Sequence, residues 1–270
     1  MEIWATHNAA AVYDLKERLL KGVETYGHQV MGWDDDDDDE LPNPVVYRIE
    51  SGVAIAKIKG AMIANTSWLS RIYGIVSYQD IQEVLAKLVR NQDVQTIVLD
   101  YDTPGGSFAG IAECGRAIQA VDKVKPVYSY VSGSAHSGGA WLSTAARAVY
   151  GVPESSSYGS IGVIVVHTEV SRLRQEIGYN DTVFRSAPKK ALGTPYEPLS
   201  DEARAEINSD ISYIHDLFVS ALSSHLSKPF SDIAKIATGA TFWAPRALEL
   251  GLVSKLLPIE ELVGTLAANR

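Results

Sequence analysis

Residues 96–107 read Thr-Ile-Val-Leu-Asp-Tyr-Asp-Thr-Pro-Gly-Gly-Ser. The first part, 96–101, is short and mostly apolar, which is typical of a strand buried on both faces of a parallel sheet. The loop that follows ends the strand, because Pro104 fixes one φ angle and two glycines let backbone N–H groups approach a ligand closely. Taken alone, the loop is equally well explained as a tight turn. It does not match a phosphate-binding loop, because Ile111 rather than lysine follows Gly110.

Strands and helices alternate on both sides of this stretch. Upstream, the sequence predicts strands over 45–49 and 53–58, and a helix over 78–90 with one apolar face. Such alternation predicts an α/β fold in which helices flank a stacked, mostly parallel sheet. The elements expected downstream are strands at 127–131, 148–151, 161–166 and 182–185, a helix ending near Ala146, and helices at 109–120, 169–176, 200–224, 231–237, 244–250 and 259–268.

The chain divides into three parts. Apolar residues at three- and four-residue steps predict a helix over 9–26, so we interpret 1–31 as an appended helical arm. Residues 32–44 form an acidic, proline-containing linker, and 45–270 form a single α/β domain.

Composition narrows the class of protein. The net charge is -9 over 270 residues, but an acidic run at 34–40 accounts for most of it, and the remaining acidic residues nearly balance the 24 basic ones. No basic patch for nucleic acid is therefore expected. The single cysteine, Cys114, fits a reducing compartment. No secretory leader and no apolar stretch long enough for a membrane span is visible, so we expect a cytoplasmic protein without a membrane anchor.

A second unusual loop, Gly133-Ser-Ala-His-Ser-Gly-Gly139, runs from a strand into a helix. A serine on such a sharp turn presents its hydroxyl as a nucleophile elbow does, and its neighbours must be small. Ser137 is the better nucleophile candidate, Ser134 is the alternative, and both could serve only as helix caps. His136 is a poor candidate for the base, because the side chains of adjacent residues usually point apart.

The third loop, 186–198, contains Lys189 and Lys190. Two loop lysines are usually solvated and nothing more. A lysine that is buried beside a serine loses solvation, which lowers its pKa from about 10.4 towards 7–8 and makes it a competent general base. The loop thus offers either a solvated surface or a catalytic base.

Together these motifs resemble the signal peptide peptidase A (SppA) family of Ser–Lys peptidases, which has the ClpP/crotonase fold. The stretch that begins at Lys190, Lys-Ala-Leu-Gly-Thr-Pro, is most similar to the phage branch, the capsid-assembly or head maturation proteases. The resemblance covers about 45–258. The motifs that carry it are Thr103-Pro-Gly-Gly, Gly133-x-Ala-x-Ser-Gly-Gly139, Gly159-Ser-Ile-Gly-Val163 and the Lys190 loop.

The resemblance implies a role for each matching side chain. Ser137 matches the family nucleophile, Lys190 matches the general base, and Ser160 matches the serine whose hydroxyl helps to position that lysine. Lys189 competes with Lys190, which we favour because Lys-x-x-x-Thr-Pro matches the family spacing from that position.

The resemblance also implies an oxyanion hole made of backbone N–H groups, from Gly138 and from Gly105 or Gly106. The chemistry it implies is hydrolysis of peptide bonds by a serine endopeptidase, which needs neither a cofactor nor a metal ion. Its substrate would be a peptide or an unfolded protein.

In cellular relatives, the serine and the lysine come from adjacent protomers of a ring. The resemblance therefore implies a homo-oligomer with active sites at protomer interfaces, with phage capsid or scaffold proteins as further partners. If the chain is encoded by a phage, its location is the host cytoplasm. The linker near Asp34–Pro44 is a candidate site for cleavage by the protein itself, because an exposed polar linker is a good protease target.

Two other functions compete with the peptidase. A noncatalytic scaffold or assembly protein of the same fold would use the motifs only as turns, but a scaffold has no reason to keep Ser137, Ser160 and Lys190 together. An acyl-CoA hydratase or isomerase would share the oxyanion hole, but the sequence shows no carboxylate pair placed for that chemistry.

Overall fold

The computed structural model describes residues 43–268. The arm expected over 1–31 and most of the linker 32–44 lie outside the described residues, so the boundaries of both stay predictions. The described part begins beside a helix, where the Asn43 amide donates to the carbonyl oxygen of Asp80 at 3.1 Å.

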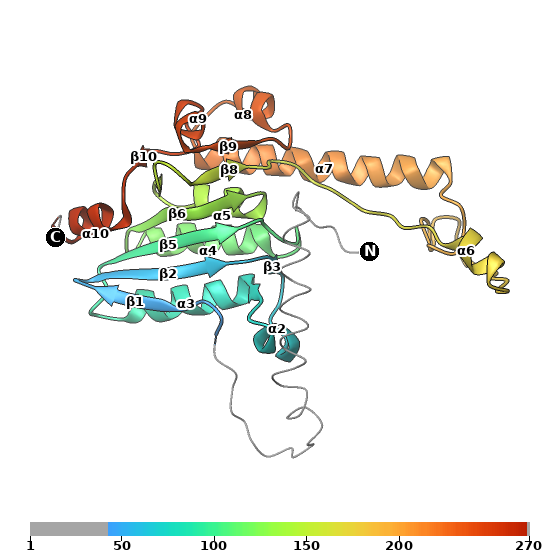
Figure 1. Cartoon of the computed structure of the whole chain (residues 1–270), viewed down its shortest axis with the longest axis horizontal. Coiled ribbons are helices and arrows are strands. Elements are labelled where there is room, and N and C mark those ends of the chain that lie inside the picture. Colours follow the sequence, from blue (N-terminus) through green and yellow to red (C-terminus); the bar gives the residue numbers. More distant parts are fainter. Residues whose placement is uncertain (1–42, 269–270) are drawn as a thin grey trace, which may run out of the picture.

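The main sheet is mostly parallel, as the sequence predicts (Figure 1). Its parallel strands follow the order β2 (Val53–Lys59), β5 (Thr96–Thr103), β6 (Val127–His136), β7 (Val149–Gly151) and β10 (Lys255–Leu256). At one edge, β1 (Tyr47–Glu50) pairs with β2 as an antiparallel hairpin. The last residues of β6 leave β7 and pair instead with β8 (Ser157–Gly159), which pairs in turn with β9 (Thr241–Trp243).

Strand β5 lies at the centre of the sheet, and the apolar stretch that predicted it explains why. Alternate side chains enter two different cores: Leu99 packs with the larger cluster, and Val98 packs on the opposite face with Tyr130 and Leu262. A strand that is buried on both faces needs a continuous apolar run rather than an alternating one.

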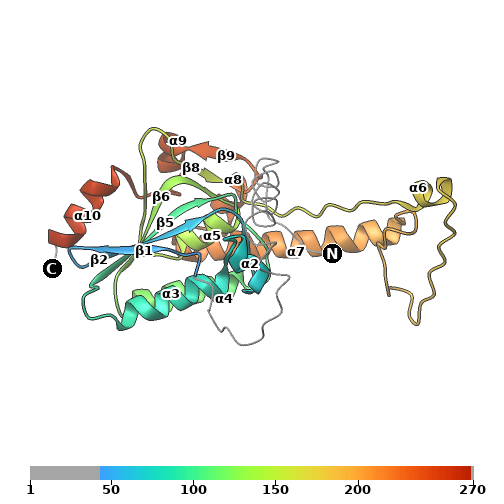
Figure 2. The ribbon, with the colours of Figure 1, turned by 60° about the horizontal axis from the view of Figure 1, so that its bottom comes forward.

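Helices cover both faces of this sheet (Figure 2). On one side lie α3 (Tyr78–Arg90), α4 (Ile111–Asp122) and α5 (Gly138–Thr144), and α10 (Ile259–Ala268) lies on the other. The α/β prediction, with a mostly parallel sheet and flanking helices, is therefore confirmed. Shorter elements complete the described part: α2 (Trp68–Ile72), α8 (Phe230–Ile236), α9 (Ala244–Glu249), and the paired strands β3 (Met62–Ile63) and β4 (Val76–Ser77).

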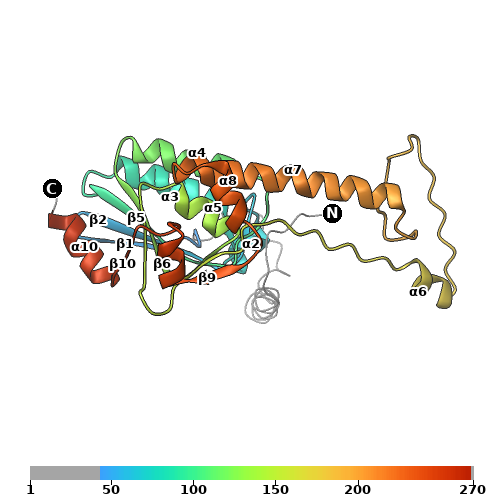
Figure 3. The same ribbon diagram turned by 90° about the horizontal axis from the view of Figure 1, so that it is seen from above.

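Residues 163–213 form a projection that leaves the body of the molecule (Figures 1, 2 and 3). It contains α6 (Ser171–Glu176) and the first half of the long helix α7 (Asp201–His225). The strands predicted at 161–166 and 182–185 do not form. Apolar residues there satisfy the strand pattern, but neither segment joins the sheets of the described residues as a strand, and only an isolated bridge position forms, at Ile164.

A buried ion pair anchors α3 to α2. The carboxylate of Asp80 is fully buried and lies 2.8 Å from the guanidinium of Arg71. It also accepts hydrogen bonds from the N–H and the hydroxyl of Ser77, at 2.8 and 2.7 Å, and from the hydroxyl of Thr66 at 3.1 Å. These donors offset the cost of burying the charge.

We predict that Asp80→Ala lowers the free energy of unfolding by about 3–5 kcal/mol, because the substitution leaves a buried guanidinium without this partner. Glu83→Ala is the matched control: Glu83 also pairs with Arg71, at 3.2 Å, but its side chain is 36% exposed. Its loss should cost about 1 kcal/mol or less. Urea denaturation measures both changes, and equal losses for the two variants would contradict the prediction.

Candidate active site

Ser137 stands on the turn between β6 and α5, at a φ of 49° and a ψ of -117°. A non-glycine residue in this conformation is strained, and such strain concentrates at functional sites. The turn is held by a hydrogen bond of 2.8 Å from the Ser137 N–H to the carbonyl oxygen of Gly159. This strand-to-helix geometry is the one that the nucleophile-elbow pattern predicts.

The two candidate serines differ in what their hydroxyls contact. The Ser137 side chain is buried, and its Oγ has no hydrogen-bond partner among the described residues. The Ser134 Oγ donates to the carbonyl oxygen of Thr103 at 3.2 Å. An unpaired buried hydroxyl costs free energy, and a functional role is one explanation for keeping it. The geometry therefore favours Ser137 over Ser134 as the reactive group.

His136 points away from Ser137. Its Nε2 lies 2.6 Å from the Ser157 hydroxyl on the neighbouring strand. Burial lowers the pKa of His136, and the Asp102 carboxylate partly opposes this shift. His136 thus makes a structural contact to β8. The sequence also made it a poor candidate for the general base.

The loop after β5 contains the two glycines that are candidates for the oxyanion hole, and they differ in whether their N–H groups are already hydrogen-bonded. The Gly105 N–H donates to the Thr103 hydroxyl at 3.1 Å, so it is already occupied. The Gly106 N–H has no acceptor among the described residues. A Cβ on Gly106 would lie 1.9 Å from the Met62 carbonyl oxygen, so only glycine fits there. Of the two glycines, Gly106 is the one with a donor to spare.

Gly138 lies against this donor. A Cβ on Gly138 would stand 3.3 Å from the Gly106 nitrogen and 3.3 Å from the Tyr78 hydroxyl oxygen. The Tyr78 hydroxyl itself donates to the carbonyl oxygen of Ser107 at 2.7 Å, which pins the glycine loop to α3. Burial raises the pKa of Tyr78, so the hydroxyl keeps the proton that it donates.

Tyr78 is the site residue that sequence reasoning missed. It opens the amphipathic helix 78–90 as one more apolar residue, and no motif marks it. The structure shows what the sequence does not, namely that the Tyr78 ring is buried while its hydroxyl makes a hydrogen bond at the site.

Ser160 is the next residue after Gly159, whose carbonyl oxygen accepts the hydrogen bond from the Ser137 N–H. It is buried, has a φ of 51°, and donates its N–H to the Ala240 carbonyl oxygen at 2.7 Å. The structure therefore brings Ser137, Ser160, Gly106 and Gly138 into one corner of the sheet.

Lys190 does not join this corner within one copy of the chain. It lies in the segment between α6 and α7. This segment runs at the far end of the projection in all three views (Figures 1, 2 and 3). Lys189 forms an ion pair of 2.7 Å with Glu206, on the first turns of α7. Lys190 is exposed and forms no ion pair with any described residue. Of the two lysines, Lys190 has the amine that is available to a second molecule.

Within residues 43–268, no group of three or more histidine, cysteine, aspartate or glutamate side chains is placed to hold a metal ion. In the same range, no helix is both long enough and apolar enough to span a bilayer.

Known proteins resemble this chain over most of its length. Capsid assembly protease C of Escherichia phage lambda is 27% identical over 82% of this chain and 50% of its own length. Head-tail preconnector protein GP5 of Enterobacteria phage P21 is 25% identical over 82% of this chain and 44% of its own length. The chain thus spans about half the length of these relatives. A solved structure, a point mutant of the 1510-N membrane-bound stomatin-specific protease, aligns with a TM-score of 0.49 and 17% identity, over 78% of this chain and 82% of that one.

The model of one protein family, described as Peptidase family S49, matches residues 119–270. This range includes the strained turn at Ser137, the adjoining Ser160 and the loop with Lys190. The chain belongs to peptidase family S49.

Proposed function

We propose that this protein is a serine endopeptidase in which Ser137 is the nucleophile and Lys190 is the general base. The observation that carries the proposal is the buried Ser137 hydroxyl on a strained turn beside the N–H of Gly106, both of which lack a hydrogen-bond partner within residues 43–268. Membership of family S49 supports the reaction class. In this proposal, residues 45–270 form the peptidase domain.

The chemistry follows from these groups. The neutral amine of Lys190 takes the proton of the Ser137 hydroxyl as Oγ attacks a peptide carbonyl carbon. The carbonyl oxygen becomes an oxyanion, which the N–H groups of Gly106 and Gly138 stabilise by about 3–4 kcal/mol for each donor. As the C–N bond breaks, the lysine returns the proton to the leaving amine. In the second step the lysine takes a proton from water, which attacks the acyl-enzyme, and then returns that proton to the Ser137 oxygen as the ester bond breaks.

The base is supplied by a neighbouring copy of the chain. The segment between α6 and α7, which carries Lys190, lies away from the turn between β6 and α5 in its own chain, so its exposed lysine is free to enter the corner of another molecule (Figures 1, 2 and 3). The projection also carries apolar side chains that a monomer leaves in water, including Phe184 at 91% exposure and Val166 at 78%. Exposed apolar groups of this kind favour a protein interface. Transfer of the ammonium group out of water favours its neutral, basic form.

The proposed substrate is a peptide segment of an unfolded or partly folded protein, and the natural partners are capsid or scaffold proteins in a host cytoplasm. The name of the lambda relative, a capsid assembly protease, supports this choice. A noncatalytic assembly role is the alternative. It is disfavoured because it leaves both the unpaired Ser137 hydroxyl and the free Gly106 donor without a use.

We predict that Ser137→Ala and Lys190→Ala each reduce casein hydrolysis by about 10³-fold or more, since members of a catalytic unit fail together. Lys189→Ala should stay close to wild-type activity, because it removes only an exposed ion pair. Circular dichroism checks that each variant is folded. Full activity of Lys190→Ala would show that the base is misassigned.

Mixing the two inactive variants should restore activity. An assembly that contains both Ser137→Ala and Lys190→Ala chains has interfaces where an intact serine meets an intact lysine from its neighbour. The measurement is casein hydrolysis after the two proteins are dissociated together and reassembled, with each variant carried through alone as control. A mixture that stays inactive, although mass spectrometry detects mixed assemblies, would rule out a shared site.

Gly138→Ala should lower kcat by about 10²–10³-fold, because the new methyl group occupies the space between the Gly106 N–H and the oxyanion. Gly115→Ala is the matched control. Its added Cβ also meets a neighbour at 3.3 Å, the Nε1 of Trp141, but lies in α4 and away from the oxyanion donors. Similar kcat losses in both variants would indicate general damage to the fold rather than a blocked oxyanion hole.

A further inference from the structure

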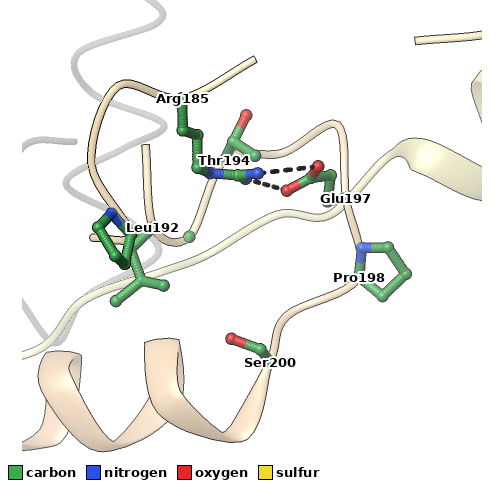
Figure 4. A pocket seen from close by; sticks show the side chains of 8 residues that line it. Arg185, Leu192, Thr194, Glu197, Pro198 and Ser200 are labelled. Atoms are coloured by element: carbon green, nitrogen blue, oxygen red, sulfur yellow. Dashed lines mark hydrogen bonds and ion pairs between the residues drawn. The ribbon is translucent and has the colours of Figure 1, made fainter. Parts of the chain in front are cut away.

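Arg185 joins two parts of the loop that carries Lys190. Its Nε donates a hydrogen bond of 2.9 Å to the carbonyl oxygen of Lys190. The two terminal nitrogens of the same guanidinium point to the carboxylate of Glu197 and pair with both of its oxygens (Figure 4). All three nitrogens of one rigid, planar group are therefore engaged at once, a geometry that lysine cannot reproduce.

Among the described residues, the Lys190 carbonyl oxygen has Arg185 as its hydrogen-bond partner. The loop is otherwise a run of short turns, in which the N–H groups of Lys190, Leu192 and Thr194 donate to the carbonyl oxygens of Ala187, Lys189 and Ala191 at 3.0, 3.3 and 3.1 Å. It bends around an open cavity of about 210 Å³, whose lining includes Leu192 and Thr194 (Figure 4). The backbone beside Lys190 is unusual, because Ala191 has a φ of 59° and Gly193 a φ of 74°. A chain that turns this way without a packed core under it depends on polar contacts for a single conformation.

We infer that Arg185 is a positioning residue, which Glu197 orients in turn so that its Nε fixes the backbone of Lys190 and thereby the direction in which that side chain leaves the projection. The inference rests on the proposed function, in which Lys190 is the general base. A base that approaches from another molecule must be aimed before it arrives, because an error of about 1 Å can cost about 10²-fold in rate.

The neighbouring ion pair does not serve this purpose. Lys189 contacts Glu206 only through its side chain, and this contact ties the loop to α7 without reaching the Lys190 backbone. Arg174 also pairs with both oxygens of a carboxylate, that of Asp181, but through Nε and a terminal nitrogen, at 2.5 and 2.9 Å, and this pair lies around α6. It offers a control of matched chemistry on the same projection.

The experiment compares steady-state hydrolysis of a quenched fluorescent peptide, selected as a substrate of the wild type, by five variants. They are Arg185→Lys, Glu197→Gln, the charge swap Arg185→Glu/Glu197→Arg, the control Asp181→Asn, and Lys190→Ala. Sedimentation at the assay concentration verifies that each variant is assembled to the same extent as the wild type. Values of kcat and KM are then compared at equal assembly.

We expect Arg185→Lys and Glu197→Gln to lower kcat by about tenfold to 10²-fold with KM within about twofold of the wild type, because the misaimed base slows proton transfer and not peptide binding. The charge swap restores an ion pair but cannot donate from position 185 to the Lys190 carbonyl, so it should not recover kcat. Asp181→Asn should retain wild-type kcat and KM.

The outcomes separate the two hypotheses. If Lys190→Ala is inactive while the Arg185 and Glu197 variants have wild-type kcat, the positioning role is wrong and the proposed base stands. If the charge swap recovers kcat, the pair only stabilises the projection, and the positioning role is again wrong. If Lys190→Ala keeps its activity, the proposed function itself fails.

Discussion

The hydrogen bond from the Ser137 N–H to the Gly159 carbonyl is the constraint on which the site depends. It ties the last turn of β6 to β8 and holds a serine at a positive φ that the residue would not adopt alone. The change of partner along β6, from β7 to β8, brings the end of β6 next to Gly159 and so makes the Ser137–Gly159 hydrogen bond possible.

Close contacts between backbone atoms arrange the rest of the corner. The Met62 carbonyl excludes any side chain at Gly106, and the Thr103 hydroxyl occupies the N–H of Gly105. Tyr78 then fixes the loop from the side of α3. Each contact removes one alternative conformation or one competing donor, so that of Gly105 and Gly106 only Gly106 keeps an N–H without an acceptor among the described residues. Preorganised donors of this kind need no rearrangement when charge develops.

Much of the body was predictable from sequence, because buried parallel strands such as 96–101 are apolar throughout and the helix 78–90 has a regular apolar face. The same reasoning failed on the projection. The apolar residues at 161–166 satisfy a strand pattern, although Ile161 is buried in the core and Val166 is exposed on the projection. The choice between Gly105 and Gly106 was also beyond the sequence, because it depends on the direction of one threonine hydroxyl.

Helix α7 joins the body to the loop that carries Lys190. Phe218 and Leu222 near its end are buried in the core with α5, and Glu206 near its start pairs with Lys189. A continuous helix of 25 residues is about 37 Å long. It therefore acts as a spacer that sets the distance between the core and this loop. Each residue inserted or deleted would move the loop by about 1.5 Å and rotate it by about 100°, so the length of α7 fixes both how far the Lys190 loop reaches from the core and the direction in which it faces.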